Sequence, residues 1–446
     1  MTDDYLISEK PFPALCAFAA PIIIGNLFQQ FYTMVDSVIV GRYVGEQALA
    51  AVGASYALTA VFICVAMGGG IGAAVVVSRY FGAGDYGRMK TAVSTALIAF
   101  VGISVVLAVA GHVSNKAVLV LLHTPENVLD QAGVYLDIYF FGLPFLFMYN
   151  ILSSLFNALG KSRYPLFFLI FSSLLNGLLD VLFVTKLHAG VAGVAWATLL
   201  AQGISAVLSC AVFFVVMRAY KCGSYVRFRS KELVNMMHIA VPSVLQQAAV
   251  SIGMLLVQSV VNGFGAEVLA GYAAAARVES IAVVPMASLS TALSSYTSQN
   301  IGAKKLERVF QGYHAANILV AAFAIASCVF LTLYHDRMMR LFLGTGGSAL
   351  ARSIGSRDMQ FKGWFYGIMG AKMAVDGLLR GAGDMKFFTI ANMVNLLIRV
   401  MLSMLLAPVV GVCMVWYAVP IGWLANFTIS YTAYRSGKWK RSLLIQ

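Results

Sequence analysis

Long apolar stretches separated by short polar segments recur along the whole chain. Each stretch continues for about 20 residues, the length a helix needs to cross a bilayer, and lacks the period-two alternation of a membrane β-strand. A backbone in lipid must satisfy its own hydrogen bonds, which favours helices. The pattern predicts twelve transmembrane helices, at residues 12–41, 47–77, 89–112, 129–158, 165–186, 190–217, 234–263, 267–297, 309–334, 359–381, 386–407 and 410–434.

The composition points the same way as the pattern. Hydrophobic residues make up 60% of the chain and charged residues only 11%, whereas soluble domains carry about 25% charged residues. No long polar segment remains between the apolar stretches. The chain is therefore expected to be an all-α polytopic membrane protein whose first partner is the lipid bilayer.

The basic residues predict the orientation. Of the 31 lysines and arginines, 20 fall on one side of the predicted spans, 8 on the other and 3 inside them. The positive-inside rule then places both termini on the cytoplasmic side of the membrane. The membrane is expected to be a bacterial plasma membrane. Because the basic residues lie in short loops, the net charge of +13 does not indicate nucleic-acid binding.

The start of the chain has no basic n-region or cleavage site, so the first span is not read as a removable signal. The outer loop 335–362 is expected to carry a short surface helix.

The chain also repeats itself. SRYFGA at residues 78–83 matches SQNIGA at residues 298–303, an offset of 220, and Trp196 matches Trp416 at the same offset. Each half holds an even number of spans, so both halves insert the same way up. The repeat predicts two pseudo-symmetric six-helix lobes, at residues 1–217 and 234–446, joined by a cytoplasmic linker at residues 218–233.

Two carboxylates interrupt the apolar spans of the first lobe. Asp36 and Asp180 are costly in lipid unless they face a cavity or a partner, and such residues mark ion or proton paths. Asn176 lies one turn before Asp180, and the rise per residue places Thr198 at a similar depth. Oxygen ligands of this kind suit a hard cation such as Na⁺, and protonation of either acid is the alternative. Asn176 and Thr198 could also serve only as hydrogen bonds between helices.

The second lobe carries a different set of charges. Lys372 and Asp376 are spaced to pair along one helical face, and Glu279 is expected to compensate Arg399. Structural ion pairing is the favoured interpretation of these charges. The candidates for second-lobe coupling or substrate contact are Gln246, Gln247, Arg277, Glu279 and Arg399.

Other chemistry finds little support. The GKS at residues 160–162 lacks the preceding glycine-rich loop of a P-loop, and the glycines of residues 67–72 favour close helix packing. The six histidines and six cysteines have no metal-binding spacing. We therefore expect neither an enzyme nor a cofactor beyond a coupling ion, H⁺ or Na⁺.

These features together resemble the multidrug and toxic compound extrusion (MATE) family. They are the run 21–41 with Asp36, the motifs SRYFGAG and SQNIGAKK, the paired LGKSRYP and RGAGDMK, and Asn176-xxx-Asp180 followed by GVAGVAWAT. The likeness covers about residues 10–436. It implies a monomeric twelve-helix exporter of cationic, amphipathic compounds, driven by a sodium or proton gradient. It also places Asp36, Asn176, Asp180 and Thr198 on the first-lobe cation site of the prokaryotic DNA-damage-inducible-like branch.

The mechanism expected from this reading starts when a cation or proton neutralises Asp36 and Asp180. The first, fifth and sixth spans then repack, with a bend in the first, and the lobes rock between outward-open and inward-open states. The alternative is a flippase of lipid-linked oligosaccharides from the same superfamily, which would be expected to have extra helices and a more basic cavity. A channel would need a repeated filter motif or charged ring, which the sequence lacks.

Overall fold

The structure, a computed structural model, describes residues 4–39, 46–121, 124–344 and 347–443, without the side chains of residues 35–39, 46–49, 57, 127 and 441–443. Its described residues form two compact units. Unit 1 comprises Ala20–Val244, and unit 2 comprises Asp4–Ala19 together with the chain from Leu245 onward.

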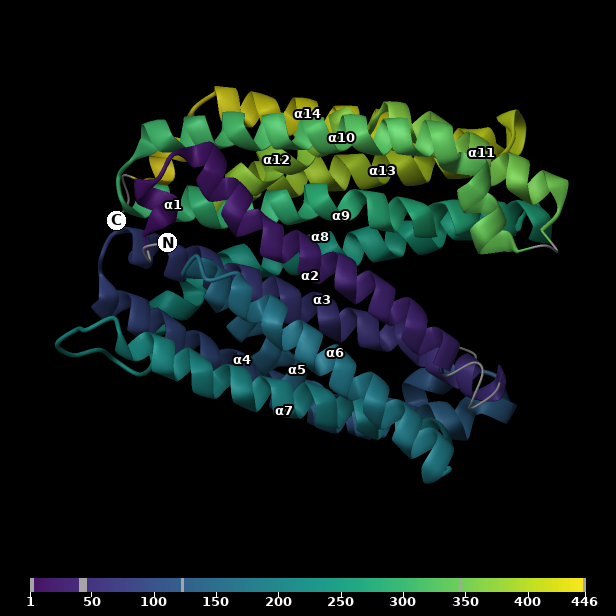
Figure 1. The fold of residues 1–446 in the computed structure, drawn as a ribbon, viewed down its shortest axis with the longest axis horizontal. Coiled ribbons are helices and arrows are strands. Elements are labelled where there is room, and N and C mark those ends of the chain that lie inside the picture. Colours follow the sequence, from purple (N-terminus) through teal and green to yellow (C-terminus); the bar gives the residue numbers. More distant parts are fainter. Residues whose placement is uncertain (1–3, 40–45, 122–123, 345–346, 444–446) are drawn as a thin grey trace. The chain divides into compact units, whose positions relative to one another are not determined.

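Unit 1 is a bundle of long helices. In it α3 packs against α4 and α5, while α7 packs against α5 and α6 (Figure 1). The elements are α2 (Pro11–Ile39), α3 (Glu46–Gly82), α4 (Tyr86–Leu121), α5 (Glu126–Ala158), α6 (Arg163–Val181), the π-helical η2 (Leu182–Lys186) and α7 (Gly190–Arg218).

Unit 2 repeats this arrangement with one broken helix. In it α9 packs against α10, α11 and α12, and α14 packs against α12 and α13. The elements are α1 (Tyr5–Ser8), α8 (Ser230–Asn262), α9 (Ala266–Gly302), α10 (Leu306–Leu343), α11 (Ala349–Trp364), α12 (Tyr366–Ala382), α13 (Met385–Val410), α14 (Cys413–Arg435) and the short η3 (Lys438–Leu443).

Two helices contribute to both units. In α2, the residues up to Ala19 belong to unit 2 and those from Ala20 belong to unit 1, and this boundary lies immediately before Pro21. In α8, the boundary between the units lies shortly after Pro242. A proline inside a helix removes one backbone hydrogen bond and favours a bend there. These unit boundaries differ from the lobe boundaries predicted at residues 217 and 234. The sequence repeat marks segments of the chain, whereas the units depend on how individual halves of a helix pack.

The tenth predicted span, 359–381, is where the structure departs most from the hydropathy pattern. Eleven described helices are long and apolar enough to cross a membrane. The twelfth, α12, is only 17 residues long, and the chain breaks at Phe365 between α11 and α12. The segment 335–362 does carry a short helix, but this helix is not confined to the surface, because one of its faces is buried. The helix found there, α11, packs against α9 and α10, and it buries Lys362 because two carboxylates offset its charge.

The internal repeat is visible in matching hydrogen bonds. The Ser78 hydroxyl donates to the Ala158 carbonyl at 3.1 Å in unit 1, and the Ser298 hydroxyl donates to the Gly381 carbonyl at 2.6 Å in unit 2. The helices α3 and α9 both have 37 residues and begin 220 positions apart. The repeated motifs therefore mark the same helix contact in each unit.

The glycine run of α3 serves helix packing, as the sequence predicted. A Cβ added at Gly69 would meet Phe100 on α4, one at Gly70 would meet Ser154 on α5, and one at Gly72 would meet the Met236 carbonyl on α8. Small residues of this kind let membrane helices approach closely. The run therefore joins α3 to three neighbours.

Replacing Gly72 with Leu is expected to destabilise unit 1 by about 1–3 kcal/mol. A Cβ there would lie 2.5 Å from the Met236 carbonyl oxygen and 2.8 Å from the Ala240 Cβ. The matched control is Gly102→Leu on α4, where an added Cβ meets nothing within 4 Å. Thermal unfolding in detergent should show a lower midpoint for the first variant alone, and equal midpoints would contradict the packing role.

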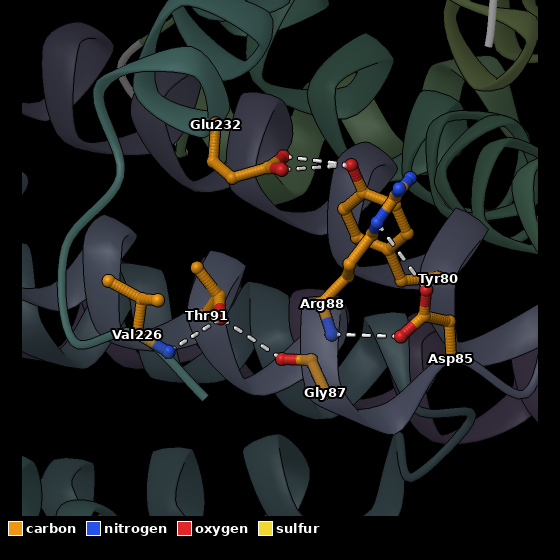
Figure 2. Close-up of polar contacts among 7 residues, drawn as sticks. All are labelled: Tyr80, Asp85, Gly87, Arg88, Thr91, Val226 and Glu232. Atoms are coloured by element: carbon orange, nitrogen blue, oxygen red, sulfur yellow. Dashed lines mark hydrogen bonds and ion pairs between the residues drawn. The ribbon is translucent and has the colours of Figure 1, made fainter. Parts of the chain in front are cut away.

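The polar linker is fixed onto unit 1 (Figure 2). The Thr91 hydroxyl on α4 accepts from the Val226 backbone N–H at 3.2 Å, and the Tyr80 hydroxyl on α3 donates to the Glu232 carboxylate at 2.9 Å. The Ser94 hydroxyl donates to the Arg227 carbonyl at 2.7 Å. The segment before α8 is thus held against the same ends of α3 and α4.

Candidate functional site

Two predicted site residues lie on one face of α6. Asn176 and Asp180 are one turn apart, with exposed fractions of 3% and 0%. Directly after them the helix widens into η2, a π-helical turn. Turns of this type are rare and occur often at functional sites. The sequence therefore buries a carboxylate and an amide beside a local irregularity in the helix.

A third predicted residue meets them from α7. The Asn176 amide donates to the Thr198 hydroxyl at 3.5 Å, and that hydroxyl donates to the Val194 carbonyl at 3.0 Å. The Asn176 side-chain oxygen is buried and has no hydrogen-bond partner among the described residues. Thr198 also lines a small cavity with Tyr139 and Gln202. The cluster thus holds a buried amide oxygen that can still accept a donor or a cation.

The fourth predicted residue, Asp36, lies on α2, but its side chain is outside the described part of the chain. The backbone still indicates its level. A Cβ added at Gly25 would lie 3.5 Å from the side chains of Leu166 and Leu169 on α6, and α2 and α6 run in the same direction (Figure 1). Equal rise along both helices carries α2 from Gly25 to Asp36 over the same distance that takes α6 from Leu169 to Asp180. Asp36 and Asp180 are therefore at similar depth.

In unit 2, Lys372 and Asp376 form the ion pair expected from their spacing. The Lys372 Nζ lies 3.3 Å from Asp376 Oδ2 and donates to Asn392 Oδ1 at 3.1 Å. The Asn392 amide donates to Asp376 Oδ2 at 3.2 Å, and the Ser430 hydroxyl donates to Asp376 Oδ1 at 2.8 Å. The four side chains form a buried and well-satisfied polar network, which rigidifies a helix bundle.

The expected partnership of Glu279 with Arg399 is wrong. Among the described ion pairs, Glu279 pairs with Lys362. Glu279 Oε2 lies 2.9 Å from the Lys362 Nζ, and Asp358 Oδ1 lies 2.9 Å from the same nitrogen. Tyr272 adds a ring face 5.6 Å from the lysine. Sequence reasoning missed this cluster because it treated Lys362 as part of an outer loop. The spacing of Asp358 and Lys362, i and i+4, was the available signal.

The remaining second-lobe candidates separate. Gln246 and Arg399 line one small crevice, together with Asn392 and Asn395. Arg277 is exposed on α9 and Gln247 is half-buried on α8, and neither joins the described networks around Lys372 and Lys362.

The family model described as MatE matches residues 21–182 and 242–405. The chain belongs to the MatE family.

Relatives of this MatE protein extend over most of its length. The probable multidrug resistance protein YpnP of Bacillus subtilis is 28% identical over 428 residues, which cover 96% of this chain and 95% of YpnP. The FAD transporter of Shewanella oneidensis is 21% identical over 342 residues, covering 76% and 75% of the two chains.

Solved structures share its fold. An outward-facing multidrug resistance MATE family transporter of the MOP superfamily superposes with a TM-score of 0.91 at 22% identity, over 99% of both chains. A MOP superfamily transporter from Pyrococcus furiosus gives 0.90 at 21% identity, over 99% of both chains. The MatE protein therefore has the predicted twelve-helix membrane fold, and it is a multi-pass transporter and not an enzyme.

Proposed function

We propose that this MatE protein is a secondary antiporter that exports small organic compounds in exchange for H⁺ or Na⁺. Coupling takes place at Asp36, Asn176, Asp180 and Thr198. The supporting observation is the buried amide oxygen of Asn176, which has no hydrogen-bond partner among the described residues and lies one turn from the buried Asp180. Carboxylate, amide and hydroxyl oxygens together suit a hard cation, and a buried carboxylate can alternatively take a proton.

The coupling ion would act by changing how α2, α6 and α7 pack. Neutralising the two acids removes the cost of bringing them together in a dry environment. Pro21 in α2 favours bending at the point where the helix passes from one unit to the other. Ion binding then raises the population of the conformation that binds the ion more tightly. The other conformation of the transport cycle releases the cargo.

The relatives support the proposed cargo, and the charge pattern supports the proposed orientation. The relatives' names include multidrug resistance proteins and a transporter of FAD, which supports a small organic cargo, with cationic, amphipathic compounds as the first class to test. The distribution of basic residues supports both termini in the bacterial cytoplasm. We expect the protein to work as a monomer, because each chain would hold a complete coupling site.

Replacing Asp180 with Asn is expected to reduce gradient-driven ethidium efflux at least tenfold, because the amide can neither be protonated nor neutralise a cation. Purified protein in proteoliposomes, under an imposed pH or sodium gradient, measures this directly. The control is Asp137→Asn. Asp137 is a carboxylate of α5 in the same unit, and it is 41% exposed beside His112. Similar efflux by the Asp180 variant and the wild type would contradict the proposal, as would the absence of wild-type efflux under both gradients.

A further inference from the structure

A small crevice inside unit 2 has an unusual polar lining for the middle of a membrane helix bundle. It has a volume of about 10 Å³, room for about one water-sized group. Its polar lining residues are Gln246 on α8 and Asn392, Asn395 and Arg399 on α13, and the other lining residues are glycine and aliphatic. No carboxylate lines it, so its fixed charge is positive.

Asn395 lines the crevice and also packs against α14. The side chain is 7% exposed. A Cβ added at Gly422 on α14 would lie 2.4 Å from the Asn395 side-chain oxygen, so the absence of a side chain at Gly422 admits that oxygen. The oxygen has no hydrogen-bond partner among the described residues. Because it lies against Gly422, the amide nitrogen is the polar atom of Asn395 that remains to line the crevice. Asn392 differs, because Lys372 and Asp376 occupy both ends of its amide.

Arg399 has no ion-pair partner among the described residues. Its Nε is buried and forms no hydrogen bond with them. Asp358 interacts with the Arg399 charge, but only beyond contact distance, and that carboxylate is already paired with Lys362. A guanidinium in mid-membrane is costly unless a partner offsets its charge. The crevice therefore combines an arginine that has no ion-pair partner among the described residues with amide side chains.

We propose that this crevice binds the carboxylate of an acidic or zwitterionic cargo molecule. Arg399 donates to the carboxylate oxygens, and Asn395 and Gln246 add amide donors. Arginine suits this role because its planar fork matches a carboxylate, and such charge-assisted bonds are the strong ones. The small volume admits about one carboxylate oxygen, and not a whole drug molecule. The inference rests on the proposed export function and adds that unit 2 selects the anionic part of the cargo.

The test compares two probes that differ only in the acid, norfloxacin and its methyl ester. Binding to the purified full-length protein is measured through the fluorescence of the drug. The wild type should bind the acid about tenfold more tightly than the ester, the value expected for one hydrogen-bonded charge pair. Arg399→Gln should remove this preference while leaving ester binding within about twofold. Arg399→Lys should retain part of it, because a lysine keeps the charge but loses the fork.

Two further variants keep the test decisive if Arg399→Gln does not fold. Asn395→Ala and Gln246→Leu each remove one donor and should each lower the acid preference about threefold. The matched control is Arg337→Gln, an exposed arginine of α10, which should keep the full preference. Equal wild-type affinity for acid and ester, or equal loss of both in the Arg399 variant, would overturn the proposal. Failure of gradient-driven efflux would instead refute the antiport function, since the binding measurement needs no gradient.

Discussion

Asp36→Asn is expected to reduce gradient-driven ethidium efflux to the level of empty vesicles while leaving expression and folding intact. Asp36 and Asp180 are at similar depth on neighbouring helices, and each is costly in lipid. Asparagine has nearly the same shape but cannot be discharged by an ion or proton. Efflux from loaded proteoliposomes measures the effect, and size-exclusion chromatography checks folding.

Gln246→Ala is the comparison that assigns coupling to unit 1. Ethidium carries no carboxylate, so this variant of the unit 2 crevice should lose much less ethidium efflux than Asp36→Asn. Normal efflux by the Asp36 variant would reject the coupling role. Equal loss in both variants would undercut coupling by the amino-terminal helices.

Lys362→Met is expected to lower the free energy of unfolding by about 3–5 kcal/mol, because it leaves buried carboxylates without their cation. Asp358 is 1% exposed, and both it and Glu279 lie within 2.9 Å of the Lys362 nitrogen. Denaturant or thermal unfolding in detergent measures the loss. Arg337→Met, which removes an exposed cation, should cost less than about 1 kcal/mol.

A second substitution separates charge from packing at the same position. Adding Asp358→Asn to Lys362→Met removes one of the two uncompensated charges, so it should recover part of the lost stability. No recovery would mean that the lysine acts through its packing and not through its charge.

The sequence predicted most of the fold because membrane helices are specified locally. Apolar length and the repeat at 220 positions gave the helices, and the spacing of Lys372 and Asp376 gave their pair. The break at Phe365 and the burial of Lys362 were missed because averaging over a window reads a charged segment as a loop. One of the two carboxylates that offset its charge, Glu279, lies 83 positions away on α9. Such contacts are set by packing, which local patterns do not encode.

The candidate site was predicted in the same uneven way. Asn176 and Asp180 share a helical face, and Thr198 was placed by depth, so their proximity could be argued from helix geometry alone. The assignment of Glu279 to Arg399 failed because helix rotation decides which of several charges at one depth face each other. The crevice at Arg399 also depends on Gly422, whose missing side chain has no meaning until α13 and α14 are packed.

The most direct test of the coupling proposal is ion movement during export. Proteoliposomes with a trapped pH or sodium indicator should report ion flux opposite to ethidium when the wild type transports, under one of the two gradients. The double variant Asp36→Asn with Asp180→Asn should show no ethidium-dependent ion flux. Ion movement that persists in the double variant would contradict the account, because the charge would then be carried elsewhere in the chain.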